Sequence, residues 1–213
     1  MVAEIFTHFD LSDDKNDSNR NGKWHACCAQ IVDAAMQHFA HYGYEKTTVS
    51  DLARAIGFSK AYIYKFFESK QAIGEVICSN RLAIIMQCAE AVIADAPGAS
   101  EQLRRLFCTL SATGTELFFH ERKLYDIAAV ASRDRWPSAT AHEKRLLNLI
   151  QQILRRARET GEFERKTPAD EAAEAIYRVI KSYASPVLLY YSLDEAEEAS
   201  AQSAALVLRS LAT

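Results

Sequence analysis

Residues 47–67 read TTVSDLARAIGFSKAYIYKFF and carry the start and stop signals of two short helices. Thr48 and Asp51 stand at the spacing of a capping box, in which the side chain of each residue binds the backbone N–H of the other. Gly57 permits a tight turn, and Ser59 is a preferred N-cap for the helix that follows. The segment therefore predicts a helix-turn-helix unit.

The apolar residues of this unit predict which of its side chains face solvent. Five of them stand where the unit needs a small core: Leu52, Ile56, Phe58, Ile63 and Phe66. Six others are left facing outward: Ser59, Lys60, Ala61, Tyr62, Tyr64 and Lys65. Hydroxyl and ammonium groups on a recognition helix contact base edges and phosphates in the major groove. We therefore expect this face to bind double-stranded DNA.

The flanking segments extend this unit into a small domain. Apolar residues recur at helical spacing from Cys28 to Phe39, and Gly43 is suited to end that helix. Residues 1–22 are rich in Asp, Asn and Ser, which predicts a flexible arm. The net charge of the chain is -3, but residues 1–22 hold five acidic residues against two basic ones, whereas residues 23–70 are locally basic. We divide the chain into the arm at 1–22, a DNA-binding domain at 23–69 and a ligand-binding and dimerisation domain at 70–213.

The remainder of the chain predicts an all-α fold with about nine helices in total, three of them in the DNA-binding domain. Glycine and proline stand between segments of helical periodicity, and alternating strand-like runs are scarce. Thr167-Pro168-Ala169-Asp170 predicts one helix start, with Thr167 as the cap, and Ser192 with Glu195 predicts another. Pro186 should kink the helix that contains it.

Residues 25–77 resemble the DNA-binding domain of the tetracycline-repressor (TetR) family. The resemblance lies in FAHYGY at 39–44, TTV at 47–49, IGFS at 56–59, YKFF at 64–67 and SK at 69–70. It implies a one-component repressor that binds palindromic operator DNA as a homodimer and is released by a small-molecule effector. It also implies that eight residues lie at or near DNA, with Tyr64 and Lys70 on the backbone: Thr48, Ser59, Lys60, Ala61, Tyr62, Tyr64, Lys65 and Lys70.

The resemblance further implies an effector cavity among the later helices. Large and adaptable side chains there suit an apolar or aromatic effector. The candidate lining residues are Met86, Phe107, Phe118, Tyr125, Trp136 and Tyr177. Plain core packing is the alternative for each of them.

The last two helices are candidates for the contact between two copies of the chain. The final helix carries a stripe of mostly small residues, which lets helices approach closely, as in a four-helix interface. The expected interface residues are Ile180, Tyr183, Val187, Ala199, Ser203 and Val207.

Other classes of function find little support in the sequence. We expect no enzyme and no catalytic residue, because no nucleophile elbow, phosphate-binding glycine loop or His-Glu-x-x-His motif occurs. The five cysteines form no Cys-x-x-Cys pair, so we expect neither metal nor cofactor, although a redox switch at Cys27 and Cys28 stays open. A rival hypothesis is a helical ligand-binding or protein-interaction module with a vestigial helix-turn-helix.

The location of the protein is also an expectation from sequence. Continuous apolar runs are far shorter than the roughly 20 residues of a membrane span. The acidic N-terminus lacks the pattern of a secretory signal. We therefore expect a cytoplasmic protein without membrane contact.

Overall fold

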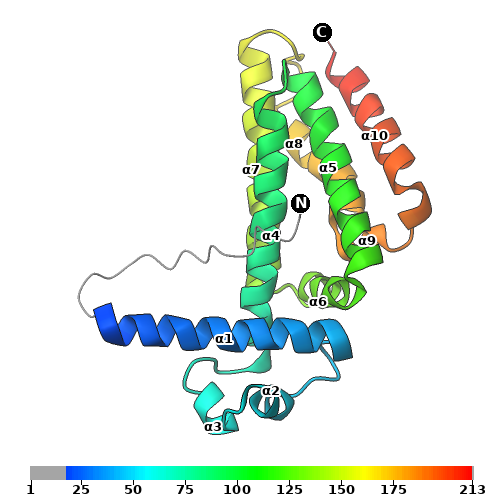
Figure 1. Ribbon diagram of the computed structural model, residues 1–213. Helices are drawn as coiled ribbons and strands as arrows, with labels where there is room; N and C mark the ends of the chain where they lie inside the picture. Colours follow the sequence, from blue (N-terminus) through cyan, green and yellow to red (C-terminus); the bar gives the residue numbers. More distant parts are fainter. Residues whose placement is uncertain (1–17, 213) are drawn as a thin grey trace.

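The computed structural model describes residues 18–212, with side chains from Trp24 onward. This part of the chain contains ten α-helices, one short 3-10 helix and no strand. The predicted all-α fold is therefore confirmed. Figure 1 shows an upright helical bundle standing on a small group of three helices.

The three helices at the base are α1 (Ser18–Tyr42), α2 (Val49–Ile56) and α3 (Lys60–Ile63). Helix α1 begins inside the segment that we predicted as a flexible arm. Adding residues to an existing helix gains a hydrogen bond for each residue fixed, so the helix anchored after Trp24 can extend through polar Ser18–Gly22. The prediction for residues 1–17 lies outside the described part of the chain.

Helix α4 (Lys70–Ala94) runs from the base into the bundle, beside α7 (Pro137–Glu159) and α5 (Ala99–His120). By length and composition alone α4 is apolar enough to cross a membrane, and in this structure it packs against α5 and α7. Helices α8 (Ala169–Ala184) and α10 (Ala196–Leu211) complete the bundle. Helix α6 (Arg122–Arg133) crosses between the bundle and α1 (Figure 1).

Two hydrophobic clusters hold the chain together. One joins α4, α5, α7, α8 and α10, and the other joins α1, α2 and α3 to the first half of α4 and to α6. Trp136, at the corner between α6 and α7, belongs to the second cluster, and its ring lies 5.5 Å from that of Tyr44. A Cβ atom at Gly74 of α4 would lie only 3.0 Å from the Trp136 ring. The corner between α6 and α7 therefore packs directly against α4.

Two of the predicted helix starts differ in the structure. Helix α8 begins at Ala169 with Pro168 at its N-cap and no side-chain cap, and the Thr167 backbone N–H donates to the Glu164 carboxylate at 3.2 Å. Ser192 forms no side-chain cap, and a 3-10 turn at Leu193–Glu195 precedes α10.

The kink expected at Pro186 is a full break between two helices. Ser185 is extended, as a residue before proline prefers to be, and α9 (Pro186–Leu189) starts a new direction.

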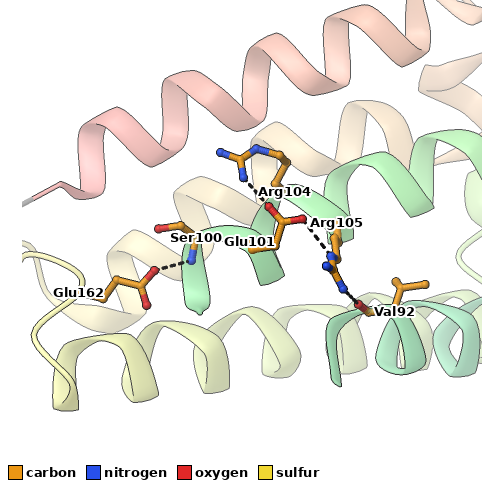
Figure 2. A network of polar contacts seen from close by, with 6 residues as sticks. All are labelled: Val92, Ser100, Glu101, Arg104, Arg105 and Glu162. Carbon is orange, nitrogen blue, oxygen red and sulfur yellow. Dashed lines mark hydrogen bonds and ion pairs between the residues drawn. The ribbon is translucent and has the colours of Figure 1, made fainter. Parts of the chain in front are cut away.

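The N-terminus of α5 is capped by a residue distant in sequence. Gly98 has no side chain to cap the helix, and the Glu162 carboxylate accepts the N–H groups of Ala99 and Ser100 at 2.9 and 2.8 Å. Figure 2 shows Glu162 reaching from the loop after α7 toward Ser100. On the same helix Arg105 donates to the carbonyl of Val92 at 3.0 Å, so α5 is tied both to that loop and to α4.

Candidate DNA-binding surface and effector cavity

The helix-turn-helix forms through the local signals expected of it. The Thr48 hydroxyl accepts the Asp51 N–H at 3.2 Å, and Asp51 accepts the Thr48 N–H at 2.9 Å. The hydrogen bonds from Thr48 lower the pKa of Asp51. Gly57 takes a left-handed conformation with φ 72°, and the Ser59 hydroxyl accepts the Tyr62 N–H at 3.1 Å. These contacts fix α2 and α3 relative to each other.

Seven of the predicted DNA-binding residues lie on this unit, and the structure exposes six of them. The exposed residues are Thr48, Ser59, Lys60, Ala61, Tyr64 and Lys65. Tyr62 differs, because its ring is half-buried and packs against Phe58 and Phe66 at centroid distances of 4.9 and 5.2 Å. The Tyr62 side chain therefore also anchors α3 to its surroundings.

Two contacts with α1 complete this anchoring, and sequence reasoning missed both. The Cys27 sulfur lies 3.6 Å from the Tyr62 hydroxyl, and the Trp24 ring lies 4.3 Å from the Phe66 ring. Trp24, Cys27 and Ile31 recur at helical spacing, so the sequence did contain the signal for a shared face. Helix α3 is thus held against α1 by aromatic rings and a thiol.

Lys70, the eighth predicted residue, has a role inside the protein. Its ammonium donates to the carbonyl oxygens of Tyr44 at 2.9 Å and Glu45 at 3.5 Å. It also lies 4.3 Å from the centre of the Tyr44 ring. Burial lowers the pKa of Lys70. Lys70 therefore ties the start of α4 to the turn between α1 and α2.

Only one of the six predicted pocket residues, Tyr177, lines the cavity between the bundle helices. Met86 and Phe107 are core residues of the bundle, and Trp136 belongs to the cluster at the base. Phe118 packs on Tyr125 at a ring distance of 5.0 Å, and the Tyr125 hydroxyl donates to the carbonyl of Pro186. These five side chains pack within the protein and do not line this cavity, because a large side chain on a buried face serves packing as well as it serves a ligand.

The cavity lies among α4, α6, α7, α8 and the start of α9, and its volume is about 40 Å³. Its apolar wall consists of Leu82, Ala139, Leu146, Ala184 and Pro186. Its polar wall consists of Ser132, His142, Glu143, Tyr177, Lys181 and Ser185. Sequence reasoning missed His142, although Ala139, His142 and Leu146 share a helical face.

The ionisable groups of the polar wall have defined states. Glu143 and Lys181 form an ion pair at 3.0 Å. Burial, with the guanidinium of Arg145 nearby, lowers the pKa of His142 to about 4, so the imidazole is neutral at pH 7. Burial and then the charge of Glu143 raise the pKa of Tyr177 to about 12, so the phenol keeps its proton.

The predicted dimer residues divide into two groups. Ile180, Tyr183 and Val207 are buried within the chain itself, with exposed fractions of 0%, 9% and 9%. The Tyr183 hydroxyl also contacts the Ala199 carbonyl and the Ser203 hydroxyl, at 3.1 and 2.9 Å. These three side chains are corrected to core positions, because helical periodicity identifies an apolar face without saying what covers it.

The other predicted dimer residues, Val187, Ala199 and Ser203, are half-buried. Helices α8 and α10 also expose Val179 and Leu206, with exposed fractions of 38% and 63%.

The described residues hold no group of three or more His, Cys, Asp or Glu side chains that could bind a metal ion. Cys27, Cys28, Cys78, Cys88 and Cys108 are all free thiols.

An exposed helix-turn-helix joined to a helical bundle defines a class of DNA-binding regulators. Residues 31–76 match the family model of bacterial regulatory proteins, tetR family. Residues 99–207, just over half of the chain, match the tetracyclin repressor-like C-terminal domain. The chain belongs to the tetR family of bacterial regulators.

Individual relatives agree with this assignment. The HTH-type transcriptional repressor Rv1474c of Mycobacterium tuberculosis (strain ATCC 25618 / H37Rv) is 48% identical over 44 residues, which are 21% of this chain and 24% of that protein. The chain thus matches about a quarter of that relative's length.

The fold is shared with solved structures. The fatty acid degradation regulator FadR of Bacillus halodurans superposes with a TM-score of 0.65 at 20% identity, over 85% of this chain and 94% of that one. The regulator FadR of Bacillus subtilis, solved in complex with stearoyl-CoA, gives a TM-score of 0.61 at 22% identity, over 87% and 97% of the two chains. At 20% and 22% identity, these similarities show a shared fold and nothing more.

Proposed function

We propose that this chain is one subunit of a cytoplasmic, homodimeric transcriptional repressor, and that it is not an enzyme. Each subunit inserts its α3 into the major groove at one half-site of a palindromic operator. The two half-sites lie about 34 to 36 Å apart, one turn of the double helix. A small-molecule effector releases the DNA because it binds better to a conformation in which the two α3 helices no longer match this spacing.

The exposed face of α3 is the observation that carries this proposal. Lys60 on α3, and Tyr64 and Lys65 on the turn that directly follows it, are exposed, and α3 is too short to be stable alone. Contacts with α1 and α2 hold that helix in place, so its side chains meet the DNA already positioned. Cations and hydroxyls on a fixed helix supply both the phosphate contacts and the base contacts of a recognition helix.

The dimer contact that we propose uses the exposed sides of α8 and α10. Val179 and Leu206 are exposed apolar side chains on these two helices. Together with half-buried Ala199 and Ser203 they provide an apolar surface with small residues, which suits packing against the same surface of a second copy.

The proposed effector site is the cavity among α4, α6, α7 and α8. The Bacillus subtilis regulator bound to stearoyl-CoA makes long-chain acyl-CoA molecules one class to include in an effector screen. The mixed wall of the present cavity makes uncharged polar molecules another class to include.

The test of the DNA-binding half is a salt titration of binding to DNA from upstream of the chain's own gene. We expect Lys65→Ala to weaken binding to specific and random DNA alike, because a phosphate contact does not depend on sequence. The slope of log K against log salt should fall by about 0.9 for each lost contact, hence by about two for a dimer.

The control for this titration is Lys144→Ala, which removes an exposed lysine from the distant helix α7. It should leave both affinity and slope unchanged. If wild-type protein binds its upstream DNA no better than random DNA, the result favours the rival hypothesis of a vestigial helix-turn-helix.

A further inference from the structure

The bundle cavity contains two buried polar atoms that lack hydrogen-bond partners among the described residues. These are Nδ1 of His142 on α7 and the hydroxyl oxygen of Tyr177 on α8. Nearly all buried polar atoms in folded proteins have a partner, since an unpaired one loses its hydration without compensation. Two such atoms on one cavity therefore mark a place where a ligand can restore hydrogen bonds.

The hydrogen-bonding roles of these two atoms are complementary. The Tyr177 phenol is protonated and can donate its O–H. The neutral imidazole of His142 can accept through Nδ1 when its other nitrogen carries the proton. A single hydroxyl group on a ligand satisfies both, because its oxygen accepts from Tyr177 while its hydrogen goes to His142.

The surrounding charges disfavour an ionic ligand. Lys181 and Glu143 neutralise each other across 3.0 Å, and Arg145 next to His142 is bound to Glu90 at 2.8 and 2.9 Å. Glu143 also lies near the Tyr177 phenol, and its negative charge contributes to the raised pKa of that group. A carboxylate ligand would meet Glu143, and an ammonium ligand would meet Lys181. The polar wall therefore presents no uncompensated charge to a ligand.

The size of the cavity limits what enters it in this conformation. Its volume of about 40 Å³ exceeds the roughly 10 to 15 Å³ that one water molecule requires. It is far below the roughly 300 Å³ at which pockets for drug-sized ligands begin. The cavity thus accommodates the polar end of a ligand, and a larger body must widen it at Ser185 and Pro186, where the helices break.

We propose that the effector is an uncharged molecule with an apolar body and a hydroxyl group, and that His142 and Tyr177 select this hydroxyl. This inference rests on the proposed function, since it concerns the ligand of that same regulator. The apolar body lies against Leu82, Leu146 and Pro186.

The test uses the full-length protein and four small probes of similar shape: phenol, toluene, benzoate and benzylammonium. Binding is measured by calorimetry and by the shift in melting temperature. We expect phenol to bind at least about tenfold more tightly than toluene, because a site built around a hydroxyl discriminates against analogues that lack it. The two charged probes should bind more weakly than phenol.

Matched variants assign the preference to the two residues. Tyr177→Phe and His142→Leu should each lower phenol affinity about tenfold and leave toluene affinity unchanged. Neither should lower the melting temperature of the free protein, since each removes an unpaired polar group. Tyr191→Phe, at a tyrosine with 83% of its surface exposed, is the control and should bind phenol as the wild type does.

The inference is overturned if phenol and toluene bind alike, if a charged probe binds most tightly, or if no probe binds at 10 mM. It is equally overturned if Tyr177→Phe, the milder of the two variants, retains full phenol affinity. Gel shifts with upstream DNA on the same samples distinguish a failure of this inference from a failure of the proposed function. Loss of specific DNA binding in the wild type contradicts the proposed function, whereas the probe series judges the cavity alone.

Discussion

The ammonium of Lys70 binds two backbone oxygens of the turn before α2 and thereby fixes where α4 begins. We expect Lys70→Ala to lower the free energy of unfolding by about 1 kcal/mol, the scale of one net hydrogen bond at a partly exposed site. Urea denaturation measures this change. Lys144→Ala, at an exposed lysine on α7, should leave the urea midpoint unchanged.

The same variant separates two roles for Lys70 in DNA binding. Because its ammonium is engaged within the protein, we expect Lys70→Ala to change the salt slope of DNA binding less than Lys65→Ala does. An equal change in slope would show that Lys70 also contacts a phosphate.

Residues whose role depends only on near neighbours were predictable from sequence. Thr48 and Ser59 cap their helices as expected, because a cap needs only a hydroxyl at the right spacing from a backbone amide. Tyr62 was assigned to the outward face, yet it is half-buried against Phe58 and Phe66. That position depends on α1, more than 30 residues away in the chain, and helical spacing within α3 carries no information about it.

At the scale of helices, the carboxylate of Glu162 is the main cap of α5 (Figure 2). We expect Glu162→Gln to lower the free energy of unfolding at pH 7 by about 1 to 2 kcal/mol, because a charged acceptor at a helix N-terminus becomes neutral. Glu159→Gln, at an exposed residue near the end of α7, is the control and should have little effect.

The effect of Glu162 should depend on pH. Burial raises the pKa of this carboxyl, but the hydrogen bonds from Ser100 and Ala99 together outweigh burial and lower the pKa below the usual 4.5. The stabilisation is therefore complete well above pH 4.5 and is lost as the pH falls through the lower pKa of the folded state. Urea midpoints of wild type and Glu162→Gln should converge in acid, and a constant difference down to pH 3 would contradict this account.

Helix positions followed from periodicity, whereas several helix ends did not. Thr167 was expected to cap α8, but Glu164 takes up its backbone N–H, and the helix starts at Ala169. The carboxylates of Glu164 and Asp170 each stand three residues from Thr167 and could accept its N–H, and the sequence does not show which of them does so. The same holds for His142. The sequence shows a polar residue on an apolar face of α7, but it does not show that this residue lines a cavity.

At the scale of the whole molecule, the exposed apolar side chains of α8 and α10 predict the assembly. We expect Leu206→Glu to yield monomers, because it places a charge in the proposed contact between subunits without disturbing the core. Sedimentation velocity measures the change, and DNA affinity should fall with it because two half-sites are no longer held together. Val92→Glu, which alters an exposed apolar residue of α4, is the control and should remain dimeric.

Gly74, Tyr44 and Trp136 meet where the bundle rests on the DNA-binding domain, and a Cβ atom at Gly74 would lie 3.0 Å from the Trp136 ring, so even a methyl group there would require its neighbours to shift. A close-packed interior of this kind hardly compresses, so it passes a displacement on to its neighbours. A shift of the corner between α6 and α7 by a few tenths of an ångström must therefore move either α4 or the turn ahead of α2. Mutations at this junction can accordingly desensitise the regulator to its inducer while every residue that touches nucleotide or inducer stays intact.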